Sequence, residues 1–351
     1  MSQPKHIVSN SFHFYCGNVL DVYGKWPSPQ AIISDGAYGV RGFDGDTIGV
    51  GGLSEWYRPH LKAWDIAAKP SSTLWFWNTE IGWATVHPLI ESYGWKYVQT
   101  IVWNKGLGHI AGNINGKTIR QYPVVSEICV LYQRAAMFHT ADGPFSAQAW
   151  LRYEWKRSGL PLSKSNEACG VKNAATRKYL TQDWLWYWPP GEMVVKMAQY
   201  LKGFGKTTER PYFSLDGIHE ITAQDWDSLR YNWHHTHGLT NVWSEGQLHG
   251  SERMRGGDFK SAPRVLSKSQ FSAMHLNQKP LEFMRRLITA TTDKNDVVWE
   301  PFGGLASASV AAIEMGRHAC VAEINANFQP PAYMRILETA NKHMPQIRLV
   351  S

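Results

Sequence analysis

Residues 297–305 read VVWEPFGGL: an apolar strand-like run, an acidic residue, a pair of glycines and the start of a helix. Glycines let the backbone turn tightly and approach a ligand closely, and the N-terminus of the following helix attracts hydrogen-bond acceptors. One helix later, residues 320–323 read CVAE, so Glu323 ends the next predicted strand, where a carboxylate suits the two hydroxyls of a ribose. Taken alone, the stretch is also readable as an ordinary strand–turn–helix unit whose glycines only permit packing.

Strands and helices alternate on both sides of this stretch. Pro280 opens a helix predicted to run to about residue 291, because proline is tolerated in the first helical turn. Beyond the glycine pair, a helix over 305–315 ends at Gly316 and a strand follows over 318–322. The C-terminal region is therefore predicted to form a parallel strand–helix–strand unit.

The N-terminal region repeats the alternation. Apolar, β-branched and aromatic runs predict strands at 31–33, 73–77, 97–103 and 127–132, and amphipathic runs predict helices at 55–68 and 82–93. Pro88 is expected near a start or a kink of the second of these helices. Alternation at both ends predicts one largely parallel sheet with helices on its faces. The fold class is a doubly wound, Rossmann-like α/β sheet.

The stretch 141–271 lacks this alternation and is rich in Trp, His, Lys and Arg. We therefore predict a core formed by 1–140 and 272–351 and an inserted, mainly helical region at 141–271. Within the insert, 162–180 combine a helix, a glycine turn and a second, polar-faced helix, which is similar to a helix-turn-helix. The residues that would then contact DNA are Lys172, Asn173, Thr176, Arg177 and Lys178. A helical hairpin with solvated polar residues accounts for the same pattern equally well.

Composition excludes several classes of protein. No apolar run approaches the roughly 18 residues of a membrane helix, and the polar N-terminus lacks a secretory signal, so we expect a soluble, cytoplasmic protein without a membrane partner. The four cysteines form no C-x-x-C pair, and the histidines of 234–237 lack metal-ligand spacing, so no metal site is expected. A formal charge of +7 and 17 Trp are compatible with a nucleic-acid partner.

The C-terminal blocks resemble those of DNA amino-methyltransferases. Residues 277–280 read NQKP and precede 298–304, VWEPFGG. In that family a Lys-Pro segment precedes an S-adenosylmethionine (SAM) loop written D-P-F-x-G-S-G-T. Here Glu300 replaces the aspartate, and residues 305–307, LAS, replace Ser-Gly-Thr. The resemblance implies SAM as the cofactor.

The same resemblance assigns roles to individual residues. It implies that Glu323 binds the ribose, that Asn18 contacts the adenine, and that Lys279 approaches the methionine end of SAM. The other residues implied to line the SAM pocket are Asp35, Glu300, Pro301, Phe302 and Gly304.

Residues 34–39 read SDGAYG after a buried strand. They resemble the family's catalytic motif D/N/S-P-P-Y/F/W, with Asp35 and Tyr38 on its first and last positions and Gly36-Ala37 in place of two prolines. An exocyclic amine is a poor nucleophile because its lone pair is delocalised into the ring. Acceptors aimed at its protons, such as the Asp35 carboxylate and the Gly36 carbonyl, favour the pyramidal nitrogen that attacks a methyl group. Tyr38 would stack on the extruded base. The plain alternative is a strand-to-turn junction, since D-G is a common turn dipeptide.

Two weaker matches lie between these blocks. Residues 101–105, IVWNK, resemble the family's W-x-K strand end, and Ser126-Glu127 its later acidic position. Each is equally readable as a strand terminus.

The order of the blocks, catalytic motif first and SAM loop last, is that of the permuted class of these enzymes. The resemblance implies a site-specific, restriction–modification-type methyltransferase from a bacterium, archaeon or phage, which acts on a flipped base of double-stranded DNA. Asp35 favours adenine N6, and cytosine N4 stays open. A homodimer or a companion restriction endonuclease is compatible with this. The alternative is a non-catalytic DNA-binding protein with the same fold, and the basic insert disfavours RNA or protein substrates.

Overall fold

The chain divides into two compact units, Met1–Arg134 with Tyr231–Ser351, and Ala135–Arg230. The computed structural model describes residues 5–40, 48–107, 117–246, 248, 252–254 and 278–343. The second unit is shorter than the insert expected at 141–271, because Val242–Trp243 form a strand (β9) that pairs with the sheet of the first unit. A strand of two residues is too short to show a periodicity in the sequence.

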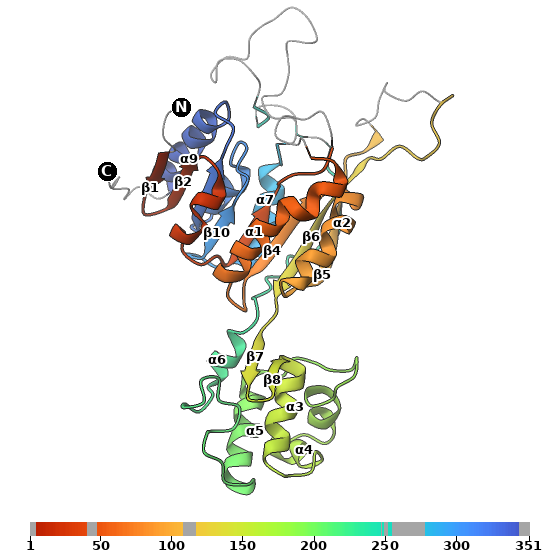
Figure 1. Ribbon diagram of the computed structural model, residues 1–351, viewed down its shortest axis with the longest axis vertical. Helices are drawn as coiled ribbons and strands as arrows, with labels where there is room; N and C mark the ends of the chain where they lie inside the picture. The colour runs from red at the N-terminus through yellow and green to blue at the C-terminus, as the bar shows by residue number, and fades with distance from the viewer. Residues whose placement is uncertain are drawn as a thin grey trace, which may run out of the picture. The chain divides into compact units, whose positions relative to one another are not determined.

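Nine strands of the described residues form one sheet, in the order β1-β2-β11-β10-β3-β4-β6-β5-β9 (Figure 1). Besides β9, the strands of this sheet are β1 (Lys5–Val8), β2 (Phe12–Cys16), β3 (Ala31–Ser34), β4 (Thr73–Asn78), β5 (Trp95–Asn104), β6 (Ser126–Arg134), β10 (Val297–Glu300) and β11 (His318–Glu323). Neighbours from β2 to β4 are parallel, whereas β6 is antiparallel to both β4 and β5. The predicted doubly wound α/β fold is confirmed.

The sheet has a topological switch point between β10 and β3. The chain proceeds from β10 to its neighbour β11 on one side, and from β3 to its neighbour β4 on the other. In open α/β sheets, ligands bind beyond the carboxyl ends of the strands at such a point. Asp35 follows β3 and Glu300 ends β10, so both lie at this switch point.

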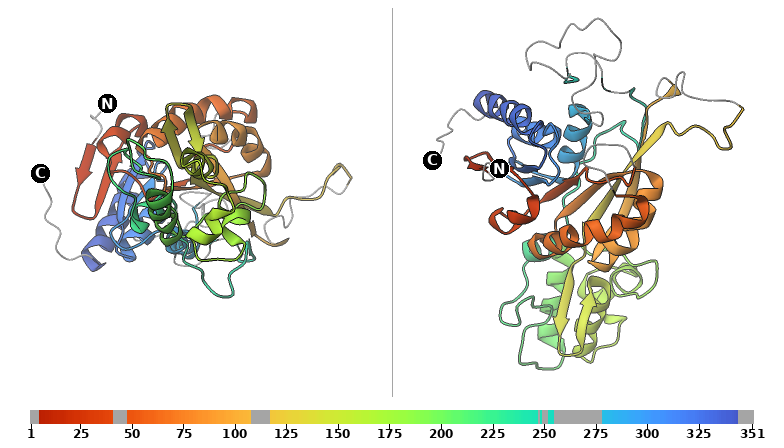
Figure 2. Two further views of the ribbon diagram at one scale, coloured as in Figure 1. Left: turned by 90° about the horizontal axis from the view of Figure 1, so that it is seen from below. Right: turned by 45° about the horizontal axis from the view of Figure 1, so that its top comes forward.

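Helices cover both faces of the sheet (Figures 1 and 2). Alternate side chains of β4 show the division: Trp75 and Trp77 are buried in one apolar core, and Leu74 and Phe76 in the other. The first core contains α7 (Leu281–Thr291), α8 (Ser307–Glu314) and α9 (Gln329–His343), and the second contains α1 (Leu53–Ala67) and α2 (Glu80–Ser92). Short 3-10 turns occur at Val19–Asp21, Tyr23–Lys25 and Val50–Gly52. No helix within the described ranges is long and apolar enough to cross a lipid bilayer.

One helix contains a proline, and one helix begins later than expected. Pro88 lies inside α2 and not at its start, on an exposed side of the helix where water can hydrogen-bond to the carbonyl that loses its partner. Helix α8 begins at Ser307 and not at residue 305, because Ala306 takes a left-handed conformation with φ of 58°.

The second unit has its own core of aromatic and aliphatic side chains, including Trp150, Trp155, Met197 and Trp226. Its elements are the hairpin β7 (Met137–Thr140) and β8 (Gly143–Ser146), the helices α3 (Ala147–Arg157), α4 (Lys164–Ala168), α5 (Gly191–Phe204) and α6 (Ala223–Asp227), and a π-helical turn at Ala175–Tyr179. The expected mainly helical character is present, with one small hairpin added.

Candidate active site

Four of the residues singled out in the sequence lie at one edge of the sheet. Glu323 is the last residue of β11 and pairs in register with Cys16 of β2, so Asn18 follows β2 at the same edge. Glu300 and Asp35 follow on the next two strands. The parallel arrangement therefore places these side chains side by side, although they are far apart in the sequence.

Asp35 is the centre of a cluster of charged and hydroxyl groups. The Lys279 ammonium donates to both of its carboxylate oxygens, at 2.9 Å and 3.1 Å, from a position 244 residues away in the sequence. The Tyr38 hydroxyl lies 2.6 Å from Asp35 Oδ1 and 3.1 Å from Lys279 Nζ. The Lys279 side chain is only 3% exposed, whereas that of Asp35 is 21% exposed. Asp35 is thus the member of the pair that solvent or a ligand can reach.

Glu127 also belongs to this cluster. Its Oε1 lies 2.9 Å from Lys279 Nζ and 2.5 Å from the Tyr38 hydroxyl, and its Oε2 accepts from Lys105 Nζ at 2.8 Å. Burial opposes the charged form of Glu127, but Lys279 and Lys105 lower its pKa overall. Burial likewise opposes the charge of Lys279, but Asp35 and Glu127 raise its pKa. The series Lys105, Glu127, Lys279 and Asp35 thus alternates positive and negative formal charge, so the two amines offset the two acids.

The backbone after Asp35 is fixed without the two prolines of the family motif. The Ala37 carbonyl accepts from Asn78 Nδ2 at 3.0 Å and from the Tyr57 hydroxyl at 3.1 Å. Packing favours glycine at position 36, because a Cβ there would lie 2.7 Å from the ring of Phe302 and 2.7 Å from the Tyr57 hydroxyl. Proline carries that same Cβ, so Phe302 and Tyr57 exclude it.

Glu300 holds the N-terminus of α8. Its carboxylate accepts from the amides of Ala308 and Ser309, at 3.0 Å and 2.8 Å, and from the Ser309 hydroxyl at 2.5 Å. Burial raises the pKa of Glu300 to about 7, against the lowering effect of these donors. An acidic residue before a helix N-terminus satisfies amides that have no partner within the helix.

Glu323 shapes the glycine turn. Its two carboxylate oxygens accept from the amides of Gly304 and Asn325, both at 2.6 Å, and burial raises its pKa to about 7. Gly303 packs directly on β11, since a Cβ there would lie 2.6 Å from Val321 Cγ2. Pro301 is buried, and the Phe302 ring packs on α1. Asn18 is exposed and its side chain accepts from Leu20 N. Asn277 lies outside the described residues.

Comparison with known proteins identifies the family. A model of the N6/N4 DNA methylase family matches residues 30–334, which include Asp35, Lys279 and the glycine turn. The chain belongs to this family of DNA methylases. It is thus an amino-methyltransferase of a family whose methyl donor is SAM.

The chain is similar to several solved structures. The chain is 10% identical to the PvuII DNA methyltransferase, which is cytosine-N4-specific, with 97% of this chain and 96% of that chain covered and a TM-score of 0.52. It is 13% identical to the M1.HpyAVI protein in its SAM complex, with 92% and 99% covered and a TM-score of 0.46. At 10% identity, the likeness to the PvuII methyltransferase shows the fold alone. No curated protein matches the sequence.

The second unit of the methylase carries the residues predicted to contact DNA. Lys172, Asn173, Arg177 and Lys178 are exposed. Thr176 is turned inward: its hydroxyl lies 3.1 Å from the Leu162 carbonyl and 2.8 Å from Asn166 Nδ2. The predicted second helix is a five-residue π-helical turn, Ala175–Tyr179, in which Thr176 N donates to Asn166 Oδ1 of the preceding helix at 3.2 Å. The helix-turn-helix therefore lacks a full second helix, while its exposed polar residues remain on the surface.

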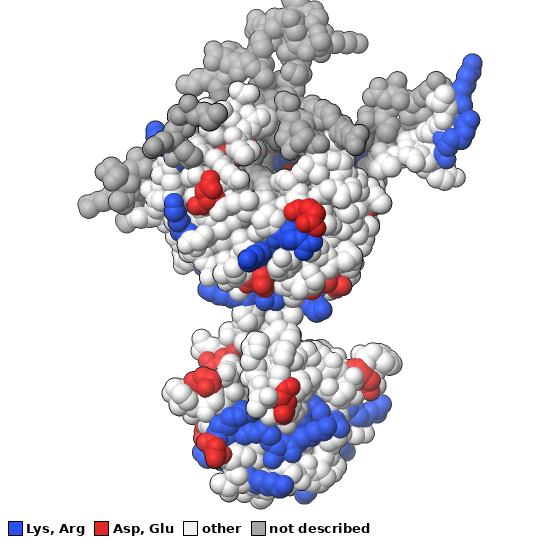
Figure 3. Space-filling view, viewed as in Figure 1, with Lys and Arg blue, Asp and Glu red and all other residues white. Residues whose placement is uncertain are grey.

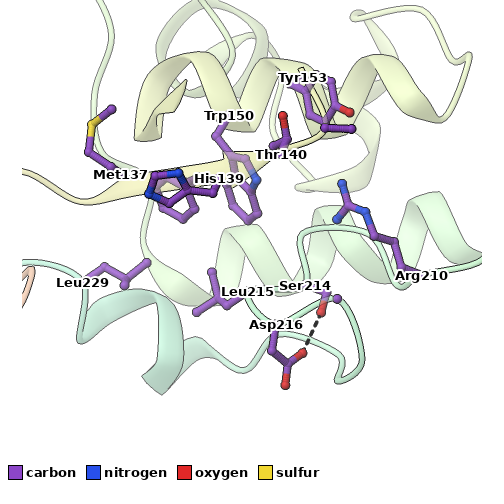
Figure 4. Close-up of a pocket in the computed structure, with 13 residues that line it drawn as sticks. Met137, His139, Thr140, Trp150, Tyr153, Arg210, Ser214, Leu215, Asp216 and Leu229 are labelled. Atoms are coloured by element: carbon purple, nitrogen blue, oxygen red, sulfur yellow. Dashed lines mark hydrogen bonds between the residues drawn. The ribbon is translucent and has the colours of Figure 1, made fainter. Parts of the chain in front are cut away.

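Lys and Arg side chains gather across the second unit in the view of Figure 3. The same unit contains a cavity of about 520 Å³, lined by residues that include His139, Trp150, Arg210 and Asp216 (Figure 4). Its charged groups already have partners. Arg210 pairs with Glu154, and Asp216 accepts from Ser214 and His219.

Proposed function

We propose that the protein transfers a methyl group from SAM to the exocyclic amino group of a base flipped out of double-stranded DNA. The observation that carries the proposal is the position of Asp35. It lies at the switch point of the sheet, next to the strand that leads into the glycine turn, and it is oriented by Lys279 and Tyr38. Family membership supports the reaction class, and this cluster supports Asp35 as the group that acts on the amine.

The residues at the sheet edge fit SAM. Glu323 offers carboxylate oxygens at the end of β11, beside the turn that its own contact with Gly304 holds in place. Asn18 offers an exposed side-chain amide at the end of β2. A carboxylate suits a ribose diol, and an amide suits an adenine edge. Glu300 contributes by fixing α8 and the turn before it. When bound, SAM supplies an electrophilic methyl group.

Asp35 would act by accepting a hydrogen bond from the target amine. As the amine attacks, positive charge develops on its nitrogen, and a carboxylate held in place beforehand stabilises that charge. The Gly36 carbonyl would accept the second amine proton, and the fixed peptide at Ala37 limits its movement. Lys279 and Tyr38 hold Asp35 in one orientation, so little reorganisation is needed at the moment of reaction.

Tyr38 has two roles in this proposal, since its hydroxyl orients Asp35 and its ring stacks on the flipped base. Its hydroxyl is fixed by Asp35 and Glu127, and Lys279 Nζ lies 5.3 Å from its ring centroid. Burial, with the two carboxylates, raises its pKa well above the usual value, so the hydroxyl stays protonated and donates. The ring is thereby held rigidly and can stack on a flipped base.

We favour adenine N6 as the target, because the first residue of the motif is an acid. The test is to incubate the protein with labelled SAM and mixed duplex DNA, then digest the DNA and identify the modified nucleoside by mass. N6-methyladenine supports the full proposal, and N4-methylcytosine corrects the base. Asp35→Asn should lose activity on the order of a hundredfold or more with SAM affinity retained. Absence of transfer to any DNA by the wild type would instead support a non-catalytic DNA-binding protein.

A further inference from the structure

The second unit exposes an aromatic tip, formed by Trp184, Leu185 and Tyr187, on the loop between the π-helical turn and α5. The exposed fractions of these side chains are 88%, 39% and 57%. Tryptophan is highly buried on average, and contiguous exposed apolar side chains mark interaction sites. Neighbouring aromatics on the same loop behave differently: Trp188 stacks on Trp226 at 4.6 Å between ring centroids. The loop thus directs some of its aromatics into the core and others to solvent.

The loop that carries the tip is fixed in several places. Its backbone is tied to α3, where Gln148 Nε2 donates to the Asp183 carbonyl at 3.0 Å and Arg152 Nη1 to the Leu180 carbonyl at 2.8 Å. At the tip itself, Leu185 N donates to Asp183 Oδ1 at 2.8 Å. A side chain presented on a fixed loop loses little conformational freedom on binding, so its contact contributes more to affinity.

The same loop is joined directly to the exposed cations. Tyr187 N donates to the Lys178 carbonyl at 2.8 Å, and Trp186 Nε1 to the Tyr179 carbonyl at 3.1 Å. Arg177 and Lys178 are exposed, and no ion pair joins either to a carboxylate of the described residues. The surface therefore combines fixed exposed rings with uncompensated positive charge. Proteins bind nucleic acids with this combination, using cations for phosphates and rings for bases.

We infer that the aromatic tip inserts Trp184 against the bases of a DNA duplex, while Arg177 and Lys178 contact the flanking phosphates. Apolar wedges of this kind partly unstack a base step and bend the duplex. The contact is independent of sequence, because every base has an aromatic face. The contact would let the proposed DNA methyltransferase hold the duplex and distort it. This inference rests on the proposed function, in which DNA is the substrate.

The experiment measures binding without catalysis. Fluorescence anisotropy of a labelled duplex is titrated with wild type, Trp184→Ala, Trp184→Phe and Arg177→Ala at two salt concentrations. Ile218→Ala is the matched control, since Ile218 is 74% exposed in the same unit but lies between Asp216 and Glu220. Circular dichroism and thermal unfolding check that each variant is folded.

We expect Trp184→Ala to weaken duplex binding about five- to 150-fold, with Trp184→Phe close to wild type and Ile218→Ala unchanged. Trp184→Ala should leave the salt dependence of binding as it is, because it removes no charge, whereas Arg177→Ala should make it shallower. Equal affinity of Trp184→Ala and wild type for duplex DNA overturns the inference. So does a change of oligomeric state in Trp184→Ala at unaltered DNA affinity, which would assign the tip to a protein partner.

The outcome is separable from that of the proposed function. Methyl transfer by the wild type, together with normal DNA binding by Trp184→Ala, would refute only the proposed contact between Trp184 and DNA. Loss of DNA binding in Trp184→Ala, without methyl transfer by the wild type, would refute only the proposed methyltransferase activity.

Discussion

Replacing Lys279 by methionine removes the ammonium group that joins Asp35 to Glu127 and keeps an unbranched side chain. Lys105 still pairs with Glu127 in the variant, but Asp35 loses both of its contacts with Lys279. The cluster then carries one uncompensated negative charge in a place where Lys279 was 3% exposed. Removing one partner of a buried ion pair costs about 3–5 kcal/mol of unfolding free energy, out of about 5–15 kcal/mol for a typical domain.

A double-mutant cycle measures this effect by denaturant unfolding. Glu127→Gln in the Lys279→Met background restores charge balance between Asp35 and Lys105. We therefore expect the double variant to be more stable than the sum of the single effects implies, by about 0.5–3 kcal/mol. Additive effects would show that Lys279 and Glu127 do not interact, contrary to the 2.9 Å contact between them.

The kinetic consequence follows from the orientation of Asp35. Without Lys279 the carboxylate can turn away from the target amine, and a displacement of about 1 Å costs on the order of a hundredfold in rate. We expect kcat to fall by about that factor and SAM affinity, measured by calorimetry, to stay near wild type, with Lys279→Arg partly restoring kcat. Weak SAM binding with normal kcat at saturation would refute this reasoning and would return Lys279 to the cofactor.

Three further predictions concern other parts of the structure. Gly36→Ala should lose about 1–3 kcal/mol of stability, because its Cβ would lie 2.7 Å from the Phe302 ring; Phe302→Leu in the same chain should recover part of the loss in urea unfolding. Since burial raises the pKa of Glu323 to about 7, its neutral form favours the fold below about pH 4.5 and that stability is lost as pH rises through 7. Glu323→Gln should therefore reduce the loss of unfolding free energy between pH 5 and 8 by about 3 kcal/mol, as measured by urea unfolding at each pH. An unchanged pH profile would contradict the raised pKa of Glu323. Lys172→Ala should weaken binding to cognate and random duplexes alike and make the salt dependence of binding shallower, as titrations on both duplexes at two salt concentrations will show.

The sheet could be predicted because its signals are local. Apolar runs such as Ala31–Ser34 and Val297–Glu300 end in polar or glycine residues, so both the strands and their carboxyl ends can be found in the sequence. Parallel pairing then brings Asp35 and Glu300 to one edge. The boundaries that were missed depend on single residues. The left-handed conformation of Ala306 moves the start of α8 to Ser307, and the contacts of Thr176 with Asn166 and Leu162 accompany a π-helical turn in place of the expected second helix.

Glu127 shows why the candidate site was only partly predictable. The rule that functional residues follow parallel strands finds Asp35, Glu300 and Glu323, but Glu127 lies at the start of β6. Because β6 is antiparallel to β4 and β5, its first residues lie at the edge where those strands end. The direction of β6 is set by pairing across the sheet and leaves no mark in the local sequence, so an acid at position 127 was equally readable as a strand terminus.

The missing prolines of the catalytic motif are explained by the same three-dimensional context. Prolines stiffen a backbone by restricting φ, and their loss suggests a looser segment when residues 34–39 are considered alone. In the folded chain Asn78 and Tyr57 fix the Ala37 carbonyl from two sides, and Phe302 fills the space that a side chain at Gly36 would need. Phe302 belongs to the block that leads into the glycine turn, so the change at Gly36 is matched by packing from the segment that follows β10. The contacts of Gly36 and Ala37 therefore hold the Asp35 segment in place without prolines, and the role that we propose for Asp35 depends on a carboxylate held in this way.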